Sequence, residues 1–283
     1  MANAILLISC PDKKGITATV TNFVFHNNGN IIHADQHIDS QSNTFFMRIE
    51  WSLEHFKLNK EDMARSFPSI AGVFQMDWKI YFSDEISRVA IFVSKYTHCL
   101  TDLLLRHQAG QLKCQIPLII SNHPDAKNIA HHFGIDYFEF SVLNKNKIEQ
   151  EKRQLEFLRE AKIDCIVLAR YGQIFTKDFV SAFPDRIINI HHSFLPAFKG
   201  EKPYAQAYKK GVKLIGATSH YVIENLDEGP IIEQDTVRIS HRDSVEDLKL
   251  KGEDLEKAVL GRAMRWHLER KILVYNNKTV VFD

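Results

Sequence analysis

From residue 88 onward, short apolar segments alternate with longer segments whose apolar residues recur at helical spacing, and this alternation most constrains the fold. The apolar segments have the length of buried strands and span residues 89–93, 116–121, 137–140, 165–169 and 187–190. The segments between them predict helices over 101–108, 125–133, 148–161 and 177–183. Longer strands over 214–223 and 231–238, a helix over 244–271 and a hairpin over 272–282 follow. Ser244, with Asp247 three residues later, predicts a capping-box variant at the start of that helix, and Asn276-Asn277 predicts the turn of the hairpin. Such alternation predicts an α/β fold with a Rossmann-like, mostly parallel sheet covered on both faces.

The first 83 residues predict a different order of elements. Apolar runs place strands at 4–9, 31–39, 44–53 and 77–82, and helical spacing places helices at 16–26 and 60–67. The order βαββαβ is that of a ferredoxin-like unit. We therefore expect a small α+β domain over residues 1–83, a linker at 84–87 and a larger α/β domain over residues 88–283.

Composition narrows the function classes. The 36 Lys and Arg residues balance 35 Asp and Glu residues, so no strong overall field attracts nucleic acid. No apolar run approaches about 18 residues, so we expect no membrane span, and the N-terminal run predicts a first strand rather than a signal peptide. The four cysteines, at positions 10, 99, 114 and 165, form no C-x-x-C pair, which favours buried, reduced thiols in a cytoplasmic protein.

Two polar residues stand at the carboxyl end of the apolar strand 187–190. Asn189 and His191 are two positions apart, so they point to the same side of a strand. An amide and an imidazole on one side can stabilise a developing oxyanion and move a proton. Ligands of parallel sheets bind outside the carboxyl ends of the strands, where these residues stand. An ordinary strand that ends in a polar loop fits the same residues, and both interpretations stay open.

Asp227 lies in the turn Asn-Leu-Asp-Glu-Gly-Pro between the two longer strands. Asp commonly caps such turns, so a structural role is one interpretation. If the turn opens on the same cleft as His191, Asp227 could instead orient water or polarise that imidazole. Residues 168–174 follow another buried strand, and their backbone groups could bind a flat heterocycle. An ordinary strand-to-helix connection fits them equally.

Other chemistries have weaker support. His191 and His192 are adjacent, so a strand points them apart, and no H-x-H or H-E-x-x-H pattern is present; we expect no metal site. Ser193 lies outside the G-x-S-x-G pattern of a nucleophilic serine. Cys99 beside His98 fits the ordinary start of a helix.

Taken together, several motifs resemble those of the formyltetrahydrofolate-dependent formyltransferases. The motifs are Asn189-Ile190-His191, Ser193-Phe194-Leu195-Pro196, Lys199-Gly200 and Asp227 in Leu-Asp-Glu-Gly-Pro. The resemblance implies that Asn189, His191 and Asp227 are catalytic and that His220 lies near the aspartate. It also implies a folate-binding loop made of Leu168, Ala169, Arg170, Tyr171, Gly172, Gln173 and Ile174. Gly172 stands where a bulkier apolar residue is usual in that family.

The resemblance further implies which acceptor takes the formyl group. Similar transferases hold the phosphate of an amine acceptor with a Gly-Ser-Asn loop, whereas residues 95–98 here read Lys-Tyr-Thr-His. We therefore expect water as the acceptor: hydrolysis of 10-formyltetrahydrofolate to formate and tetrahydrofolate, without a cofactor, supplying formate for purine synthesis and balancing the one-carbon folate pool. Asp227 would need a raised pKa or a relay to activate that water. Transfer to an amine and a non-catalytic folate or amino-acid sensor remain the alternatives.

The N-terminal unit resembles the ACT domains, which sense small molecules. The resemblance is carried by Cys-Pro-Asp-Lys-Lys-Gly-Ile at 10–16 and Asn-Asn-Gly-Asn-Ile at 27–31. It implies effector-binding residues in two segments, namely Asp12, Lys13, Lys14 and Gly15, and Asn28, Gly29 and Asn30. It also implies methionine and glycine as effectors and a homo-oligomer formed through these domains. A unit that only mediates assembly is the alternative.

Overall fold

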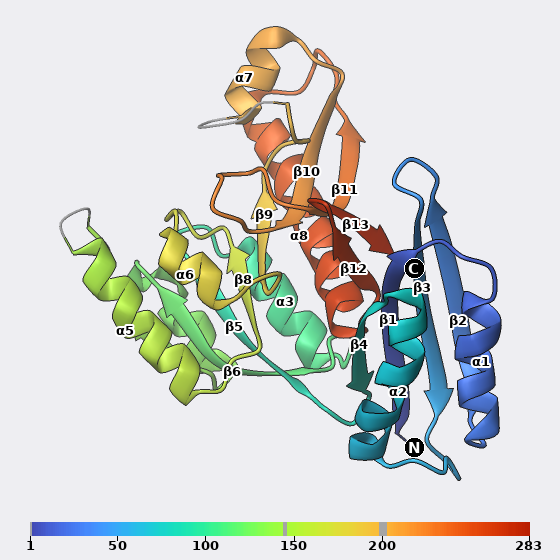
Figure 1. The fold of residues 1–283 in the computed structure, drawn as a ribbon. Coiled ribbons are helices and arrows are strands. Elements are labelled where there is room, and N and C mark those ends of the chain that lie inside the picture. The colour runs from blue at the N-terminus through green and yellow to red at the C-terminus, as the bar shows by residue number, and fades with distance from the viewer. Residues whose placement is uncertain (1, 144–145, 198–202) are drawn as a thin grey trace. The chain divides into compact units, whose positions relative to one another are not determined.

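The computed structural model describes residues 2–143, 146–197 and 203–283. The chain divides into two compact units (Figure 1). The first contains the residues up to 86 together with 270–273 and 280–283, and the second contains 87–269 and 274–279. The division after residue 86 falls within the linker expected at 84–87. The C-terminal residues 270–273 and 280–283, expected in the second domain, belong to the first unit.

The first unit has a four-stranded antiparallel sheet in the order β2-β3-β1-β4. Its elements are β1 (Asn3–Pro11), α1 (Ile16–His26), β2 (Asn30–Asp39), β3 (Thr44–Ser52), α2 (Lys60–Phe74) and β4 (Asp77–Phe82). The element order and the strand order confirm the predicted ferredoxin-like βαββαβ unit. Leu6, Ile8, Met47 and Trp51 form the core of its helix-covered face with side chains of α1 and α2.

Helix α2 extends seven residues past the predicted end at residue 67 and passes through Pro68. Proline interrupts only its own backbone hydrogen bond, and Phe67, Ala71 and Phe74 keep a buried stripe along the helix. The Asn59 side chain caps the start by accepting the backbone N–H of Asp62. Packing therefore outweighs the helix-breaking residue.

The opposite face of this sheet holds a buried ion pair. Arg48 is 3% exposed, and its Nη2 lies 2.8 Å from Oε2 of Glu50. Its Nε donates to the carbonyl oxygen of Arg270 at 3.1 Å. The guanidinium of Arg270 in turn lies 4.5 Å from the ring centre of Tyr81. The C-terminal segment 270–273 is thus tied to the open face of the N-terminal sheet.

The second unit is built on a seven-stranded sheet in the order β11-β10-β9-β8-β5-β6-β7. The strands are β5 (Ser87–Val93), β6 (Cys114–Ser121), β7 (Asp136–Glu139), β8 (Cys165–Ala169), β9 (Ile187–His191), β10 (Leu214–Tyr221) and β11 (Ile231–Arg238). The five strands from β5 to β9 are parallel, while β10 runs antiparallel to both of its neighbours. This confirms the expected mostly parallel sheet.

Helices cover both faces of this sheet (Figure 1). They are α3 (His98–Gln108), the 3₁₀ turn η1 (Pro124–Ala126), α4 (Lys127–His132), α5 (Lys147–Glu160), α6 (Lys177–Ala182), α7 (Pro203–Lys210) and α8 (Val245–Leu268). Phe179 of α6 and Leu158 of α5 pack with Phe92 on one face, and α3 and α8 lie together on the other. The sequence did not predict α7, which has only eight residues and begins at a proline.

Two predicted local signals are confirmed near the C-terminus. The side chain of Ser244 accepts the backbone N–H of Asp247, and Asp247 accepts that of Ser244, so α8 begins with a capping box. Strands β12 (Ile272–Tyr275) and β13 (Lys278–Val281) form the predicted hairpin. Its turn residues Asn276 and Asn277 both have positive φ, which asparagine tolerates better than most residues.

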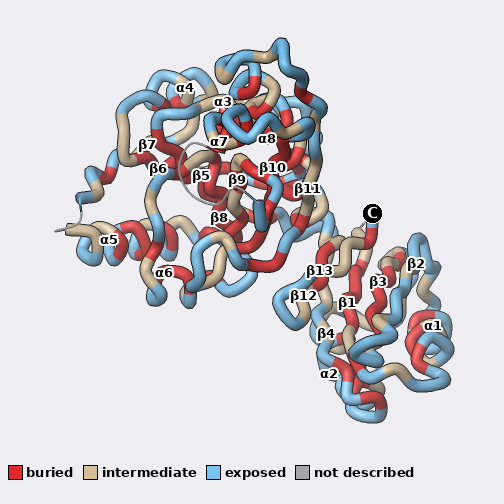
Figure 2. Tube along the Cα trace, turned by 90° about the horizontal axis from the view of Figure 1, so that it is seen from above, coloured by how far each residue is buried: buried red, intermediate tan, exposed pale blue. Residues whose placement is uncertain are grey.

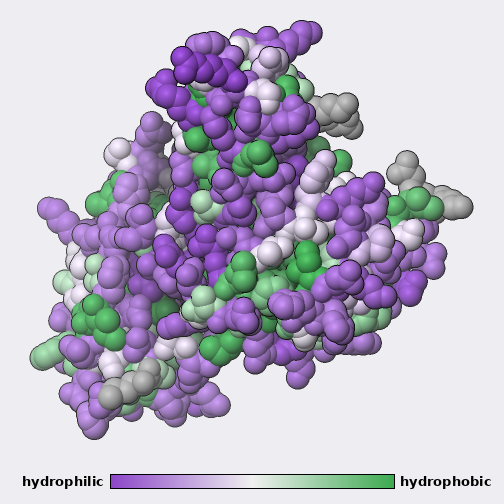
Figure 3. Space-filling view, turned by 180° about the vertical axis from the view of Figure 1, so that it is seen from behind, coloured by the Kyte–Doolittle hydropathy of each residue, from purple (hydrophilic) through white to green (hydrophobic). Residues whose placement is uncertain are grey.

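Burial follows this architecture. Buried residues concentrate in the central strands of each sheet, whereas β2 is exposed along most of its length (Figure 2). The face drawn in Figure 3 is mostly hydrophilic, with apolar residues in separate groups. All four cysteines are free and buried, as expected. None of the helices in the described parts of the chain is long and apolar enough to cross a membrane.

Candidate active site

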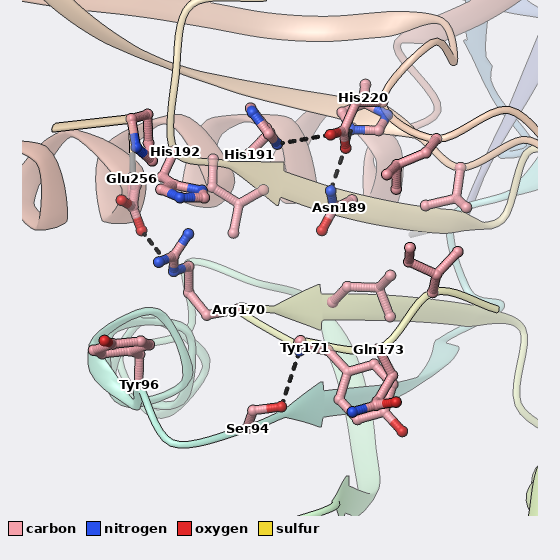
Figure 4. A pocket seen from close by; sticks show the side chains of 18 of the residues that line it. Ser94, Tyr96, Arg170, Tyr171, Gln173, Asn189, His191, His192, His220 and Glu256 are labelled. Carbon is pink, nitrogen blue, oxygen red and sulfur yellow. Dashed lines mark hydrogen bonds and ion pairs between the residues drawn. The ribbon is translucent and has the colours of Figure 1, made fainter. Parts of the chain in front are cut away.

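The second unit contains a pocket of about 980 Å³ at the carboxyl ends of its parallel strands (Figure 4). Ser94 follows β5, Arg170 follows β8 and His191 ends β9, and all three line it. This is where α/β folds of this kind bind ligands. We call the part lined by Leu168, Tyr171, Ile174, Phe175, Val180 and Val222 the apolar end, and the part lined by Lys95, His98, Tyr204, Lys249, Glu253 and Glu256 the polar end.

Asn189, His191 and Asp227 meet in this pocket together with His220. The Nδ1 atom of His191 lies 3.2 Å from Oδ2 of Asp227, and Nε2 of His220 lies 3.7 Å from Oδ1 of the same carboxylate. The amide nitrogen of Asn189 lies 3.2 Å from Nε2 of His220 (Figure 4). Asn189 pairs with His220 in the register between β9 and β10, so the sheet itself fixes this contact.

Hydrogen bonds determine which ring nitrogens face a ligand. Nδ1 of His220 lies 2.8 Å from the carbonyl oxygen of Tyr221, so this nitrogen must donate. The Nε2 atom of the same ring faces the amide nitrogen of Asn189 and the carboxylate of Asp227. In His191 the Nδ1–H donates to Asp227, while the buried Nε2 has no hydrogen-bond partner among the described residues. His191 lines the pocket, and Nε2 is the ring nitrogen that remains free to accept a proton.

Asp227 is held in a strained and strongly charged setting. Its φ of 56° lies in the left-handed region, which Asp tolerates better than most residues. Burial raises the pKa of Asp227, but hydrogen bonds and charge from His191 and His220 outweigh this and hold the pKa well below its usual range. The raised pKa expected from the sequence as one possibility is therefore wrong. The other expectation, a relay through a neighbouring group, fits a carboxylate that stays ionised.

Hydrogen bonds to the side chains of Ser94 and Glu151 hold the loop after β8 in place. The backbone N–H of Gly172 donates to Oγ of Ser94 at 2.9 Å, and Ser94 donates to Oδ1 of Asn122 at 2.6 Å (Figure 4). Thr176 donates its N–H and hydroxyl to the buried carboxylate of Glu151. An added Cβ at Gly172 would lie 3.6 Å from Ser94, so the position has room for a side chain.

The predicted loop residues divide into three groups. Leu168, Tyr171, Gly172, Gln173 and Ile174 line the pocket, and burial raises the pKa of Tyr171 to about 12. Ala169 is fully buried and is not among the lining residues. Arg170 also lines the pocket, but it turns away from the apolar end toward α8.

The comparisons with known proteins agree with this geometry. Residues 87–264 match the family model described as formyl transferase. The formyltetrahydrofolate deformylase of Synechocystis sp. is 55% identical over 279 residues, which cover 99% of this chain and 98% of that protein. The chain belongs to the formyltetrahydrofolate deformylase family.

Solved structures give the same assignment. The crystal structure of a formyltetrahydrofolate deformylase from Pseudomonas syringae pv. tomato matches with a TM-score of 0.97 and 46% identity, covering 100% of this chain and 95% of that one. Glycinamide ribonucleotide transformylase 1 from Symbiobacterium toebii matches with a TM-score of 0.67 and 28% identity, covering 72% of this chain and 97% of that one. The deformylase relatives therefore match both units, and the transformylase a smaller share of the chain.

The two predicted effector segments lie at opposite ends of α1. Residues 12–15 precede the helix, where Gly15 has a φ of 95°, and residues 28–30 follow it. A helix of 11 residues is about 16 Å long, so the two segments do not meet within this chain. Gly29 has a packing role, since an added Cβ would lie 2.6 Å from Cγ1 of Val24. Nδ2 of Asn28 donates to the carbonyl oxygen of His55.

A buried polar cluster at the polar end was missed by the sequence analysis. It consists of Glu256 on α8 with His98, Arg170 and Tyr204 around it. Glu256 belongs to a helical stripe of buried residues that includes Leu248, Gly252 and Val259. A glutamate within an otherwise apolar or small-residue stripe was the available signal.

Metal and nucleophile interpretations gain no support from this geometry. His98, Cys99 and Glu256 could bring ligand atoms within 4.8 Å of one another. The carboxylate of Glu256 already forms an ion pair with Arg170 and a hydrogen bond with Tyr204. Burial raises the pKa of the Cys99 thiol well above its usual range, which disfavours a thiolate ligand. The hydroxyl of Ser193 donates to the carbonyl oxygen of Ala197 and is buried. The predicted pair Lys199-Gly200 lies outside the described residues.

Proposed function

We propose that this chain hydrolyses 10-formyltetrahydrofolate to formate and tetrahydrofolate. The observation that carries the proposal is the convergence of Asn189, His191 and Asp227 in one pocket of a chain whose whole length matches formyltetrahydrofolate deformylases. The reaction supplies formate, which purine synthesis uses, and returns the folate carrier to the one-carbon pool. Transfer to an amine and a sensor without activity are not favoured, because the full-length relatives carry the deformylase name.

The substrate fits the two ends of the pocket differently. The aromatic and aliphatic side chains of the apolar end suit a flat pterin ring, and the backbone groups of residues 172–174 that are not already paired suit its hydrogen-bonding edge. With the ring placed there, the formyl group reaches Asn189 and His191. The side-chain amide of Asn189 then donates an N–H to the formyl oxygen, where negative charge develops.

Water attacks the formyl carbon while His191 acts as the base. Its Nε2 accepts the water proton, because Asp227 holds the opposite Nδ1–H and stabilises the imidazolium that forms. The imidazolium and Asn189 stabilise the tetrahedral oxyanion. As the bond between the carbon and N10 breaks, His191 passes the proton to N10, and formate and tetrahydrofolate leave. Asp227 stays ionised throughout.

Asp227→Asn tests this assignment. Asparagine tolerates the left-handed conformation of position 227, so the turn should keep its shape while the charge is lost. We expect kcat to fall by about 10³- to 10⁴-fold, the size found for the aspartate of a comparable His–Asp pair, with folate binding largely retained. The assay measures formate and tetrahydrofolate released from 10-formyltetrahydrofolate with no acceptor added.

Asp254→Asn is the matched control, because Asp254 is 78% exposed on α8 and should give normal turnover. Near-normal turnover in Asp227→Asn would contradict the proposed role of the carboxylate. No formate release by the unmodified protein, with activity only after an amine is added, would replace hydrolysis by transfer.

We further propose that the first unit is an ACT-like module for regulation and assembly. Its support is the ferredoxin-like topology and the exposed edge strand β2, whose Ile32 and Ile38 are 53% and 46% exposed. An unpaired edge carrying apolar side chains favours association with a second copy of the chain. Methionine or glycine, bound between residues 12–15 of one copy and 28–30 of another, would report on one-carbon demand.

Two measurements test this module. Ile38→Lys should lower the solution mass by blocking edge pairing, whereas Val73→Lys on the exposed side of α2 should leave it unchanged. Calorimetry with methionine and with glycine should show heat of binding for at least one of the two amino acids. Heat from neither amino acid would leave assembly as the module's role.

A further inference from the structure

The buried carboxylate of Glu256 has three partners from three different parts of the second unit. Nε2 of His98, at the start of α3, lies 2.8 Å from Oε2, and Nε of Arg170, after β8, lies 3.3 Å from the same oxygen. The hydroxyl of Tyr204, on α7, donates to Oε1 at 2.5 Å. Glu256 itself is fully buried, although it lies beside a pocket. None of these groups has a part in the proposed hydrolytic steps.

Glu256 remains charged in this position. Burial raises the pKa of Glu256, but the hydrogen bond from His98 and the charge of Arg170 outweigh this and lower it. Burying a charge in this way costs free energy even when the charge is paired, and an apolar side chain would often fill the space at lower cost. A role beyond packing is therefore needed to explain the cluster.

The surrounding residues are shaped to keep the cluster in place. A Cβ added at Gly252, one turn before Glu256, would lie 2.1 Å from the hydroxyl oxygen of Tyr204 and 2.3 Å from its ring, so only glycine leaves space for this tyrosine. Arg170 has a φ of 63°, a strained conformation for a residue with a long side chain. Its guanidinium lies 5.4 Å from the ring centre of Tyr96.

The ion pair between Arg170 and Glu256 joins two sides of the pocket lining. Arg170 starts from the end of β8, at the floor of the site, and reaches Glu256 on α8 (Figure 4). In this view, Asn189 and His191 lie on one side of the pair and Tyr96 on the other. The rest of the polar end includes Lys95 and Lys249, whose charges would suit an anionic group, and Glu253, whose carboxylate would suit an ammonium group. Lys249 also lies 3.6 Å from Glu246.

We propose that the Arg170–Glu256 pair is a specificity-determining bridge that closes the polar end to a second substrate, so that only water reaches the formyl carbon. The inference rests on the hydrolysis proposed above. The compound excluded is a small primary amine that carries an anionic group, since the two lysines would hold the anion. Without the bridge, its nitrogen attacks the formyl carbon, the bond from carbon to N10 breaks, and the amine proton passes to N10. The products are a formamide and tetrahydrofolate.

Arg170→Ala tests the bridge because it removes the spanning side chain and leaves Glu256 with His98 and Tyr204. The probe is O-phosphoethanolamine, added to the full chain with 10-formyltetrahydrofolate. Mass spectrometry then gives the ratio of N-formyl-O-phosphoethanolamine to formate. This ratio is taken per turnover, so it does not depend on the fraction of folded protein. We expect formate alone from the unmodified protein, with no formylated amine above the detection limit, and a ratio at least about tenfold above that limit in the variant.

Glu256→Gln breaks the same bridge from the other side and should raise the ratio as well. Arg159→Ala, at an exposed position of α5, is the matched control and should behave like the unmodified protein. Turnover to formate alone in both bridge variants would overturn the proposal, as would formylated amine made by the unmodified protein. If the proposed hydrolysis itself is wrong, the unmodified protein releases no formate when the amine is absent, so this outcome is distinguished from failure of the bridge.

Discussion

Replacing Gly229 by alanine should inactivate the site without altering Asn189, His191 or Asp227. Gly229 lies two residues after Asp227, in the turn between β10 and β11. A Cβ added there would lie 1.8 Å from the carbonyl oxygen of Tyr221, a contact that real side chains do not make below 3.0 Å. The turn must therefore move away from β10 by about 1 Å, and such a displacement of a positioning group costs about 10²-fold in rate.

The same clash disturbs a second contact of the site. The carbonyl oxygen of Tyr221 is the group that receives Nδ1–H of His220, at 2.8 Å. The backbone N–H of Tyr221 also donates to the carbonyl oxygen of Pro230 at 2.9 Å, so turn and strand cannot separate without loss of a hydrogen bond. Overpacking of this kind destabilises by about 1–3 kcal/mol.

The assay is kcat/KM for formate release together with a thermal melt. We expect kcat/KM to fall by about 100-fold and Tm to fall by several degrees. Gly72→Ala is the control, because nothing lies within 4 Å of its added Cβ and alanine favours the helix. A Gly229→Ala variant with kcat/KM within about threefold of the unmodified protein would refute the reasoning, since a displacement of about 1 Å implies a far larger loss.

Two further predictions concern the loop and the first unit. Ser94→Ala removes the acceptor of the Gly172 N–H. It should raise KM for the folate about three- to tenfold with little change in kcat, as expected for the loss of one hydrogen bond of about 1 kcal/mol. An unchanged KM would show that other contacts hold the loop. Glu50→Gln should destabilise the first unit by about 1.5–3 kcal/mol at pH 7, because the guanidinium of Arg48 loses its charged acceptor. Burial raises the pKa of Glu50, but hydrogen bonds from Arg48 and Asn3 lower it below 4.5, so this stabilisation is present above that pH and is lost as the pH falls through the folded-state pKa. The Tm difference between variant and unmodified protein should therefore narrow as the pH falls below 4.5. A difference that is constant with pH would contradict the ion-pair explanation.

Local signals predicted most of the secondary structure. The capping residue Ser244 and the turn at Asn276 and Asn277 use short-range hydrogen bonds and backbone preferences, which a sequence displays directly. The end of α2 was missed because Pro68 is a local stop signal that packing of Phe74 overrides. Helix α7 was missed because its eight residues are too few to show a period.

The site was predictable to the extent that it lies on one strand. Asn189 and His191 face one side because of strand geometry alone. The position of Asp227 against His191 depends on a turn 36 residues further along, and the family resemblance rather than local spacing linked the two. Glu256 and His98 are 158 positions apart, and only the packing of α3 against α8 brings them together. The low pKa of Asp227 likewise depends on two histidines from different strands.

The return of the chain end to the N-terminal sheet bears on how this gene can be cut and recombined. A clone that starts at residue 87 still encodes Ile272 and Phe282, two buried side chains whose segments belong to the deleted unit. A clone that stops at residue 86 leaves Arg48 without the carbonyl of Arg270. A single crossover therefore exchanges neither unit intact. Transplanting the first unit onto another enzyme requires two junctions, with the codons for residues 270–283 carried along.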